Sequence, residues 1–333
     1  MVTSVDVARD AGVSQATVSR VLNKDRSVSP ETRQRVLDAI ERLGYRPNAI
    51  ARGLVTSRSE LVGVIVSDIT NPFYPELLEA ISERLAQLGL KMVLYNAWGQ
   101  EEGAFIRLLL EQRVDGIIFT SALLDSGLVR QLADRGFPIV LANRYVDGVR
   151  CDAVSTENES GAQLVAGHLL EFGHRRIAVV AGHAKASTSR DRVRGFRAAL
   201  RSAGVKLPRE LLVRGEFRFD RAYEGTRRLL QLDAPPTAVF CVNDLMAFAA
   251  LSAARHEGVG VPDELSIVGF DAIPMSSWDV FRLTTVRQPL GDMARASVDL
   301  LVNRIADPTR PYERIVFPSE LILGDTSSPA ALR

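Results

Sequence analysis

A run of polar side chains near the start of the sequence has the chemistry needed to read DNA bases. Gln15 and Arg20 lie in one predicted helix. Glutamine can pair with adenine and arginine with guanine, while a small hydroxyl such as that of Thr17 can reach bases or phosphates. The alternative is a short surface helix whose polar face is only solvated. The candidate DNA-contacting residues of this segment are Thr3, Ser14, Gln15, Ala16, Thr17, Ser19, Arg20 and Asn23.

Two predicted helices and a tight turn must position these side chains. Thr3 can cap the first helix, and Asp6 can complete a capping box with it. Gly12 tolerates the left-handed conformation that ends a helix, and Ser14 can cap the second helix. This helix-turn-helix pattern is typical of proteins that place the second helix in the DNA major groove. A third amphipathic helix over residues 30–43 follows.

Polar and aromatic residues follow several apolar runs further along the chain. The loop over residues 67–74 ends in Phe73 and Tyr74, and Asn243 and Asp271 each follow a predicted strand. Such a set suits a small hydroxylated ligand, because aromatic rings stack on it and polar side chains bond its edges. The alternative for Asn243 and Asp271 is the capping of a helix or turn.

Two arginines could face the same ligand. Arg192 ends the polar loop after another predicted strand, and its alternative role is a buried structural ion pair. Arg144 also follows a strand. If Arg144 faces the cleft, an anionic effector such as a sugar acid fits, but a salt bridge to Asp147 or Asp152 is equally compatible with the sequence.

The region from residue 61 onward alternates apolar strands with amphipathic helices, which favours parallel sheets covered on both faces. The same alternation of helices and strands begins again at residue 157, so two similar subdomains are expected. A ligand cleft is expected where the C-terminal ends of their strands face each other. The predicted strands are 61–67, 91–95, 114–120, 138–142, 176–181, 211–215, 237–242 and 265–270. The predicted helices are 76–88, 100–112, 157–172, 189–203, 220–232 and 244–256, with one more between residues 120 and 138.

Composition narrows the class of protein. A chain of 333 residues with 46% hydrophobic content can bury a sizeable core. Neither a signal peptide nor a long apolar span is evident in the sequence. A soluble cytoplasmic protein without membrane contact is therefore expected. Residues 1–59 carry a net charge of +4 and residues 60–333 carry −3, which suits a nucleic-acid module on a larger domain. Cys151 and Cys241 are expected to be reduced core thiols, and no Cys/His spacing predicts a metal site.

Two ordered motifs carry a resemblance to a known family. The run Ala-Gly-Val-Ser is followed by Thr-Val-Ser-Arg-Val-Leu-Asn, and Tyr-x-Pro-Asn-x-x-Ala-x-x-Leu comes later. The sequence thereby resembles the lactose-repressor (LacI/GalR) family of bacterial transcription regulators. The resemblance implies a small all-α helix-turn-helix head on an α/β core of the type I periplasmic-binding-protein fold, with two doubly wound subdomains. The implied domains are a head over 1–46, a hinge over 47–60, and a core over 61–333 whose N-subdomain is about 61–156 plus 289–317 and whose C-subdomain is about 157–288 plus 318–330.

The resemblance also assigns a role to the hinge. In the family this segment folds when two copies meet in the minor groove, where a leucine from each wedges into a central base step. Leu54 occupies the position of that leucine, and Asn48 and Ala51 are the other candidate DNA-contacting residues of the hinge. An ordinary packing role is the alternative for Leu54, and Gly53 should weaken the hinge helix by up to about 1 kcal/mol.

Matched one position at a time, the resemblance implies an effector site. Phe73 and Tyr74 fall on the loop that closes over the ligand, and Arg192 falls on an arginine that holds ligand oxygens. Thr188 is a weaker candidate. The complete effector-binding set is Phe73, Tyr74, Arg144, Thr188, Arg192, Phe217, Phe240, Asn243 and Asp271.

The leading interpretation is therefore a ligand-responsive transcription regulator, expected to be a homodimeric repressor of a carbohydrate or related catabolic operon. Its expected partners are a pseudo-palindromic double-stranded operator and a small sugar-like effector, without a cofactor. A solute-binding protein of the same fold is the runner-up. An enzyme ranks third, since no phosphate-binding loop or nucleophile elbow is present and His168 and His256 are expected on helix surfaces. The absence of a leucine heptad tail favours a dimer over a tetramer.

Overall fold

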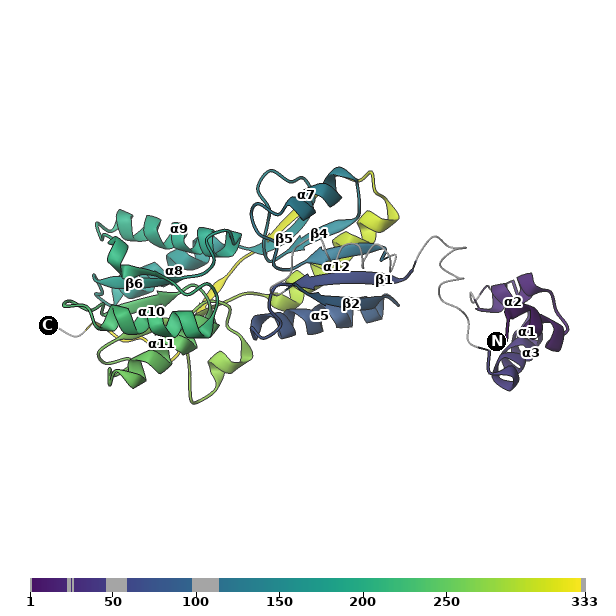
Figure 1. The fold of residues 1–333 in the computed structure, drawn as a ribbon, viewed down its shortest axis with the longest axis horizontal. Helices are drawn as coiled ribbons and strands as arrows, with labels where there is room; N and C mark the ends of the chain where they lie inside the picture. Colours follow the sequence, from purple (N-terminus) through teal and green to yellow (C-terminus); the bar gives the residue numbers. More distant parts are fainter. Residues whose placement is uncertain (1, 23–24, 26, 46–58, 98–113, 331–333) are drawn as a thin grey trace. The chain divides into compact units, whose positions relative to one another are not determined.

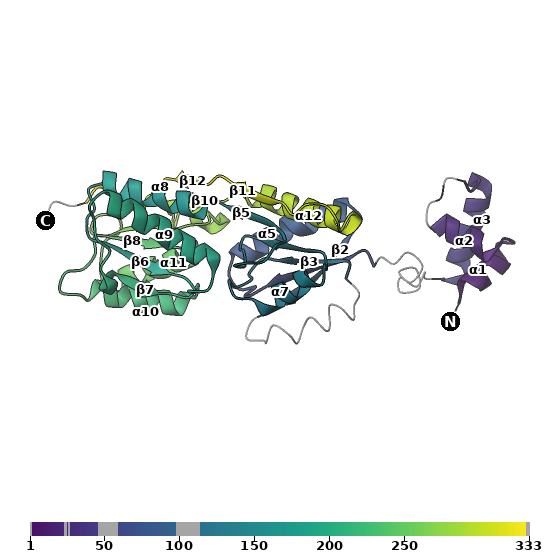
Figure 2. The same ribbon diagram turned by 90° about the horizontal axis from the view of Figure 1, so that it is seen from above.

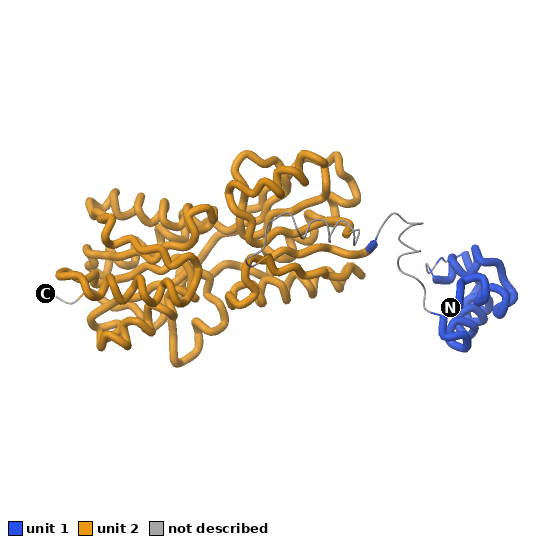
Figure 3. The backbone as a smooth tube through the Cα atoms, in the orientation of Figure 1, with its two compact units in different colours: residues 1–59 blue, residues 60–333 orange. Residues whose placement is uncertain are grey.

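The computed structural model describes residues 2–22, 25, 27–45, 59–97 and 114–330. It divides into two compact units, Met1–Ser59 and Glu60–Arg333 (Figure 3). The predicted hinge residues Asn48, Ala51 and Leu54, together with Asn23 and the predicted helix over 100–112, lie outside the described residues.

The described residues of the first unit form a three-helix head, as predicted. Thr3 and Asp6 form a complete capping box at its first helix. The Ser29 side chain accepts a hydrogen bond from the backbone N–H of Thr32, and Gly44 ends the third helix in the left-handed conformation. Small apolar side chains, including Val7 and fully buried Ala39, fill the space between the helices. The helices are α1 (Ser4–Asp10), α2 (Gln15–Leu22) and α3 (Pro30–Leu43).

The second unit holds a six-stranded sheet with every neighbouring pair parallel, in the order β11-β5-β4-β3-β1-β2. Helices α5 and α12 cover one face of this sheet and α7 covers the other (Figure 2). The strands are β1 (Leu61–Val66), β2 (Lys91–Asn96), β3 (Gly116–Phe119), β4 (Ile139–Ala142), β5 (Asp152–Thr156) and β11 (Arg314–Phe317). The helices are α5 (Phe73–Gln87), α7 (Gly127–Asp134) and α12 (Leu290–Ala306).

A four-stranded parallel sheet in the order β7-β6-β8-β9 forms the other subdomain (Figure 1). Helices α8 and α9 pack together on one face and α10 and α11 on the other. A Cβ at Gly195 would lie 2.3 Å from the Glu159 carbonyl oxygen, so glycine permits the close approach of α8 and α9. The strands are β6 (Ile177–Ala181), β7 (Leu212–Arg214), β8 (Ala238–Cys241) and β9 (Ser266–Val268). The helices are α8 (Asn158–Glu171), α9 (Ser187–Ser202), α10 (Phe219–Leu230) and α11 (Asp244–His256), with short 3-10 turns at Arg209–Leu211 and Pro274–Ser277.

Over residues 114–330 the chain passes between the two subdomains three times. After β5 it enters α8, after β10 (Thr285–Arg287) it returns to α12, and after β11 it leaves again through β12 (Glu320–Ile322). β10 and β12 pair antiparallel as a two-stranded sheet. The region near 313–323, predicted to cross between subdomains, therefore contains two strands, one in each of two different sheets.

Several smaller predictions can be compared with the structure. Cys151 and Cys241 are free thiols, as expected, but only Cys241 is fully buried and Cys151 is partly buried. The prediction that His168 lies on a helix surface is wrong, because its side chain is buried and its Nε2 lies 2.9 Å from Ser327 Oγ. His256 is exposed, as predicted. Among the described residues, no helix combines the length and apolarity needed to cross a bilayer.

Two buried histidines make the core sensitive to acid. Burial lowers the pKa of His168 and His174 below the ordinary 6.5. A histidine that is neutral in the folded protein but protonated in the unfolded chain contributes stability above about pH 6.5, and this is lost as the pH falls below that value. We expect the urea concentration at the midpoint of unfolding to fall between about pH 7 and about pH 5 in wild type, and to fall less in the His174→Gln variant. Equal losses in both proteins would show that His174 does not carry the effect.

Candidate functional site

The predicted DNA-reading side chains lie on the outer face of α2. Gln15, Ala16, Ser19 and Arg20 are exposed, while Val18 and Val21 on the opposite side of the helix are buried. The helix is thus anchored by its apolar face and leaves a polar face available to a groove.

Some of the predicted DNA-contacting side chains already form hydrogen bonds within the head. The Ser14 side chain accepts a hydrogen bond from the Thr17 backbone N–H at 3.1 Å, and the two hydroxyls lie 2.9 Å apart. Thr3 is engaged in the capping box of α1. Gln15 Nε2 donates to Ser4 Oγ at 2.9 Å. Within the described part of the head the Arg20 side chain forms no hydrogen bond or ion pair, so its guanidinium is available to read bases.

The second candidate site is a cavity lined from both subdomains of the core. It measures only about 20 Å³, which is room for about one water molecule, so a ligand larger than water requires the two sides to separate. The lining residues are Asn71, Phe73, Tyr74, Asn143, Arg144, Thr188, Arg192, Phe217, Asn243 and Asp271.

Strand ends position this lining. Phe73 and Tyr74 begin α5 after β1, and Arg144 follows β4. From the other subdomain, Asn243 follows β8 and Asp271 follows β9. Because all these strands run parallel within their sheets, their C-terminal ends bring residues that are far apart in sequence into one cavity. Eight of the nine predicted effector residues line it.

Phe240 is the exception, and its predicted role as an aromatic wall needs correction. It is fully buried within β8 and its ring stacks on Phe196 with centroids 4.8 Å apart. Its side chain belongs to the core between the sheet and α9, and it does not line the cavity.

Arg192 and Asp271 form a buried ion pair at the centre of the site. Arg192 Nη1 donates to Asp271 Oδ1 at 3.1 Å and to the Val242 carbonyl at 2.7 Å, and Nε donates to Asn158 Oδ1 at 2.7 Å. The two residues are 2% and 5% exposed. Burial raises the pKa of Asp271 to about 6, against the lowering effect of Arg192. Arg192 therefore has both of the roles considered from the sequence: it forms a buried ion pair and it lines the cavity.

Arg144 has a different environment. Its Nη1 donates to the Ser121 carbonyl at 3.0 Å, its Nη2 donates to the Tyr74 hydroxyl at 3.2 Å, and its guanidinium lies 5.2 Å from the centre of the Phe217 ring. Asp147 pairs with Arg190 and Asp152 with Arg304, so neither forms the salt bridge considered from the sequence. Arg144 is 6% exposed and its Nε lacks a partner within the described structure.

Four residues in or beside the cavity were missed or only half expected from the sequence. Asn71 and Asn143 line the cavity, and both lay beside residues already singled out. Gln288 donates to Asp271 Oδ1 at 2.7 Å from the segment that returns to the first subdomain, where no motif marks it. Asn243 lines the cavity and also caps α11 by accepting from the Met246 backbone N–H at 3.1 Å, so both of its possible roles are realised.

Contacts across the cleft hold the subdomains together beside the cavity. Arg190 of α9 pairs with Asp147 at 2.7 Å, and the Tyr145 hydroxyl donates to Asp191 Oδ2 at 2.7 Å. Phe217 and Asp271 have left-handed φ values of 59° and 127°. Backbone strain of this kind concentrates where a site must be pre-organised or must switch.

A helix-turn-helix head joined to a two-subdomain core with a cavity between the subdomains defines the class of ligand-responsive DNA-binding regulators. Residues 4–48 match the family model for bacterial regulatory proteins of the lacI family, and residues 166–327 match a periplasmic binding protein-like domain. The chain belongs to the lacI family of bacterial regulatory proteins.

Known relatives agree with this assignment over nearly the full chain. The HTH-type transcriptional repressor PurR of Photobacterium profundum is 34% identical over 320 residues, covering 95% of each chain. The ribose operon repressor of Halalkalibacterium halodurans is 36% identical over 329 residues, covering 98% of this chain and 97% of the relative. The crystal structure of the lac repressor dimer bound to operator and the anti-inducer ONPF matches with a TM-score of 0.87 at 29% identity, covering 98% and 99%. The chain is thus a transcription regulator of the repressor type.

Proposed function

We propose that the protein is a homodimer that represses a carbohydrate or related catabolic operon and responds to a small polyhydroxylated effector held between its core subdomains. The observation that carries this proposal is the cavity lined from both subdomains by aromatic rings and by buried arginine, asparagine and aspartate side chains. A ligand that touches both sides binds the closed arrangement better than the open one and so shifts the balance between them.

Arg144 and Asn143 refine the chemistry of the effector. Among the described residues, Asn143 Oδ1 is a buried acceptor without a donor, and Arg144 Nε is a buried donor without an acceptor. A sugar hydroxyl satisfies the first, and the buried positive charge of Arg144 favours a carboxylate. A sugar acid therefore meets both needs better than a neutral sugar.

A thermal-shift screen of sugars, sugar acids and nucleobases tests this proposal. A true effector raises the melting temperature in a concentration-dependent way, because it binds the folded protein only. We expect the largest shift from a sugar acid. A shift from nucleobases alone would refute the polyhydroxylated class.

The DNA-reading role of α2 makes a separate prediction. Arg20→Ala should weaken operator binding by roughly 1–3 kcal/mol and relax the preference at one base position. Titration of the variant against operators substituted at each position measures this. The matched control is Arg9→Ala on α1, where the guanidinium lies 3.6 Å from Asp6. If Arg20→Ala weakens all sequences by the same factor, Arg20 contacts only phosphate.

A further inference from the structure

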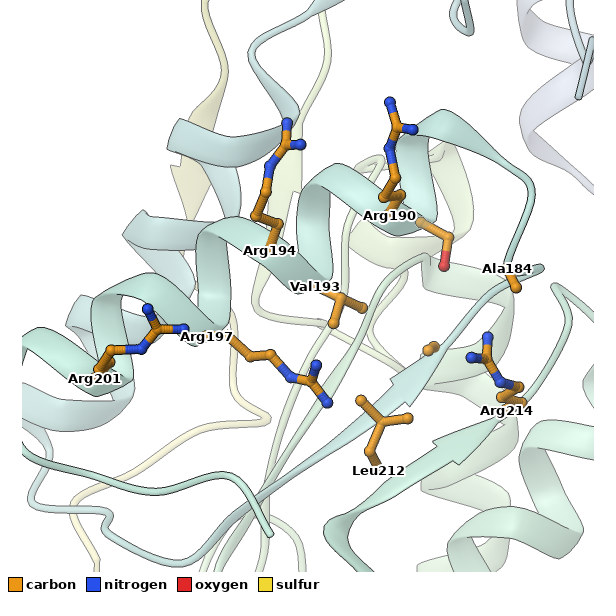
Figure 4. A pocket seen from close by; sticks show the side chains of 10 residues that line it. Ala184, Arg190, Val193, Arg194, Arg197, Arg201, Leu212 and Arg214 are labelled. Carbon is orange, nitrogen blue, oxygen red and sulfur yellow. The ribbon is translucent and has the colours of Figure 1, made fainter. Parts of the chain in front are cut away.

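A second hollow lies on the outer side of α9, separate from the effector cavity. It has a volume of about 400 Å³ and lies between α9 and the strand ends of β6 and β7 (Figure 4). The residues that line this arginine groove are Ala181, Ala184, Ser189, Arg190, Val193, Arg194, Arg197, Arg201, Leu212 and Arg214. Five of the ten are arginines and none carries a carboxylate.

The five arginines fall into two sets. Arg190 and Arg194 are engaged by carboxylates, Arg190 by Asp147 and Arg194 by Glu159. Within the described structure, Arg197, Arg201 and Arg214 have no ion pair. Their exposed side chains are the free cations of the groove.

Figure 4 shows how the free arginines are arranged. Arg197 extends toward Leu212, and Arg214 lies beyond Leu212 on the opposite side, while Arg190 and Arg194 point away. Val193 and Leu212 supply an apolar floor between the charges. Arg197 and Arg201 lie four residues apart on α9 and neither forms an ion pair within the described structure, so their like charges repel unless an anion lies near them.

We propose that the arginine groove binds a small phosphorylated metabolite. Guanidinium groups match phosphate oxygens with paired hydrogen bonds, and the apolar floor suits the carbon skeleton of such a molecule. The volume lies in the range of small-molecule sites. A DNA backbone is less well matched, because it needs a continuous basic track and this groove is short and confined to one helix and two strand ends.

The position of α9 gives the groove a route to regulation. The same helix sends Arg192 into the effector cavity and holds the cross-subdomain pair between Arg190 and Asp147. Arg190 also lines the groove, so a bound polyanion attracts its side chain away from Asp147 and toward the groove, which loosens subdomain closure. This regulatory step rests on the proposed function, whereas binding of the anion does not.

Calorimetric titration of sodium pyrophosphate into the full-length protein at low salt tests the site. We expect saturable binding to wild type and at least about tenfold weaker binding to the Arg197→Gln/Arg214→Gln double variant. Arg255→Gln, which removes an exposed arginine of α11 on the same subdomain, should bind like wild type. No binding to wild type, or equal weakening in both variants, would overturn the proposal.

Operator binding, measured with and without pyrophosphate, distinguishes a failure of the anion site from a failure of the regulatory step. A gel shift with operator DNA should show that pyrophosphate changes the operator affinity of wild type but not of the double variant. Binding without this change would overturn the regulatory step alone. If the double variant instead loses operator affinity in the absence of pyrophosphate, the groove is a DNA-backbone contact and the metabolite site is wrong.

Discussion

Arg192→Ala should lower the free energy of unfolding of the core by about 3–5 kcal/mol. The substitution leaves the buried Asp271 carboxylate without its cation and removes the donors to Asn158 Oδ1 and the Val242 carbonyl. Breaking a buried pair in this way costs more than the pair itself contributes, because a desolvated charge remains. Urea denaturation followed by circular dichroism measures the loss.

Two variants serve as controls for this prediction. The double variant Arg192→Ala/Asp271→Ala should be more stable than the sum of the two single losses implies, because no isolated charge is left. Arg255→Ala, at an exposed position, should change stability by no more than about 0.5 kcal/mol. A loss below about 1 kcal/mol for Arg192→Ala would mean that water or a shifted side chain compensates Asp271.

The same ion pair shows what the sequence could and could not predict. That Arg192 and Asp271 belong to one site followed from their places after parallel strands. That Arg192 also bonds the Val242 carbonyl and packs 3.7 Å from the centre of the Phe270 ring depends on packing that no local pattern records. Gln288 reaches the site only because the chain crosses back between subdomains there.

The elements missed from sequence have a similar cause. Strand β5 contains Asp152, Ser155 and Thr156, so it lacks the continuous apolar run by which a buried parallel strand is recognised. Asp152 is tolerated there because Arg304 of α12 pairs with it at 2.9 Å, an interaction between residues far apart in the chain. Strands such as β1 and β8, whose side chains are nearly all apolar, were predicted to within one or two residues at each end.

Unlike Arg192→Ala, Arg144→Met should not lower the free energy of unfolding of the core. Arg144 is 6% exposed and forms no ion pair with a described carboxylate. Replacing a buried charge by an apolar side chain of similar length is often neutral or stabilising. The unfolding free energy of the unliganded protein should therefore stay the same or rise, although the Ser121 carbonyl and the Tyr74 hydroxyl each lose a donor.

The main effect of Arg144→Met should be weaker binding of the effector. Each hydrogen bond from a buried guanidinium is worth about 1.5–3 kcal/mol, so effector affinity should drop roughly 10- to 150-fold. Operator affinity without effector should not change, since the head and α2 are intact.

In wild type, effector and operator must alter each other's affinity by the same factor, typically 5- to 150-fold. At an effector concentration that saturates wild type, the variant should lose this response, as fluorescence anisotropy with labelled operator would show. If Arg144→Met destabilises the core by more than about 1 kcal/mol and keeps its effector affinity, the Arg144 guanidinium is a structural group and the effector lies against other residues.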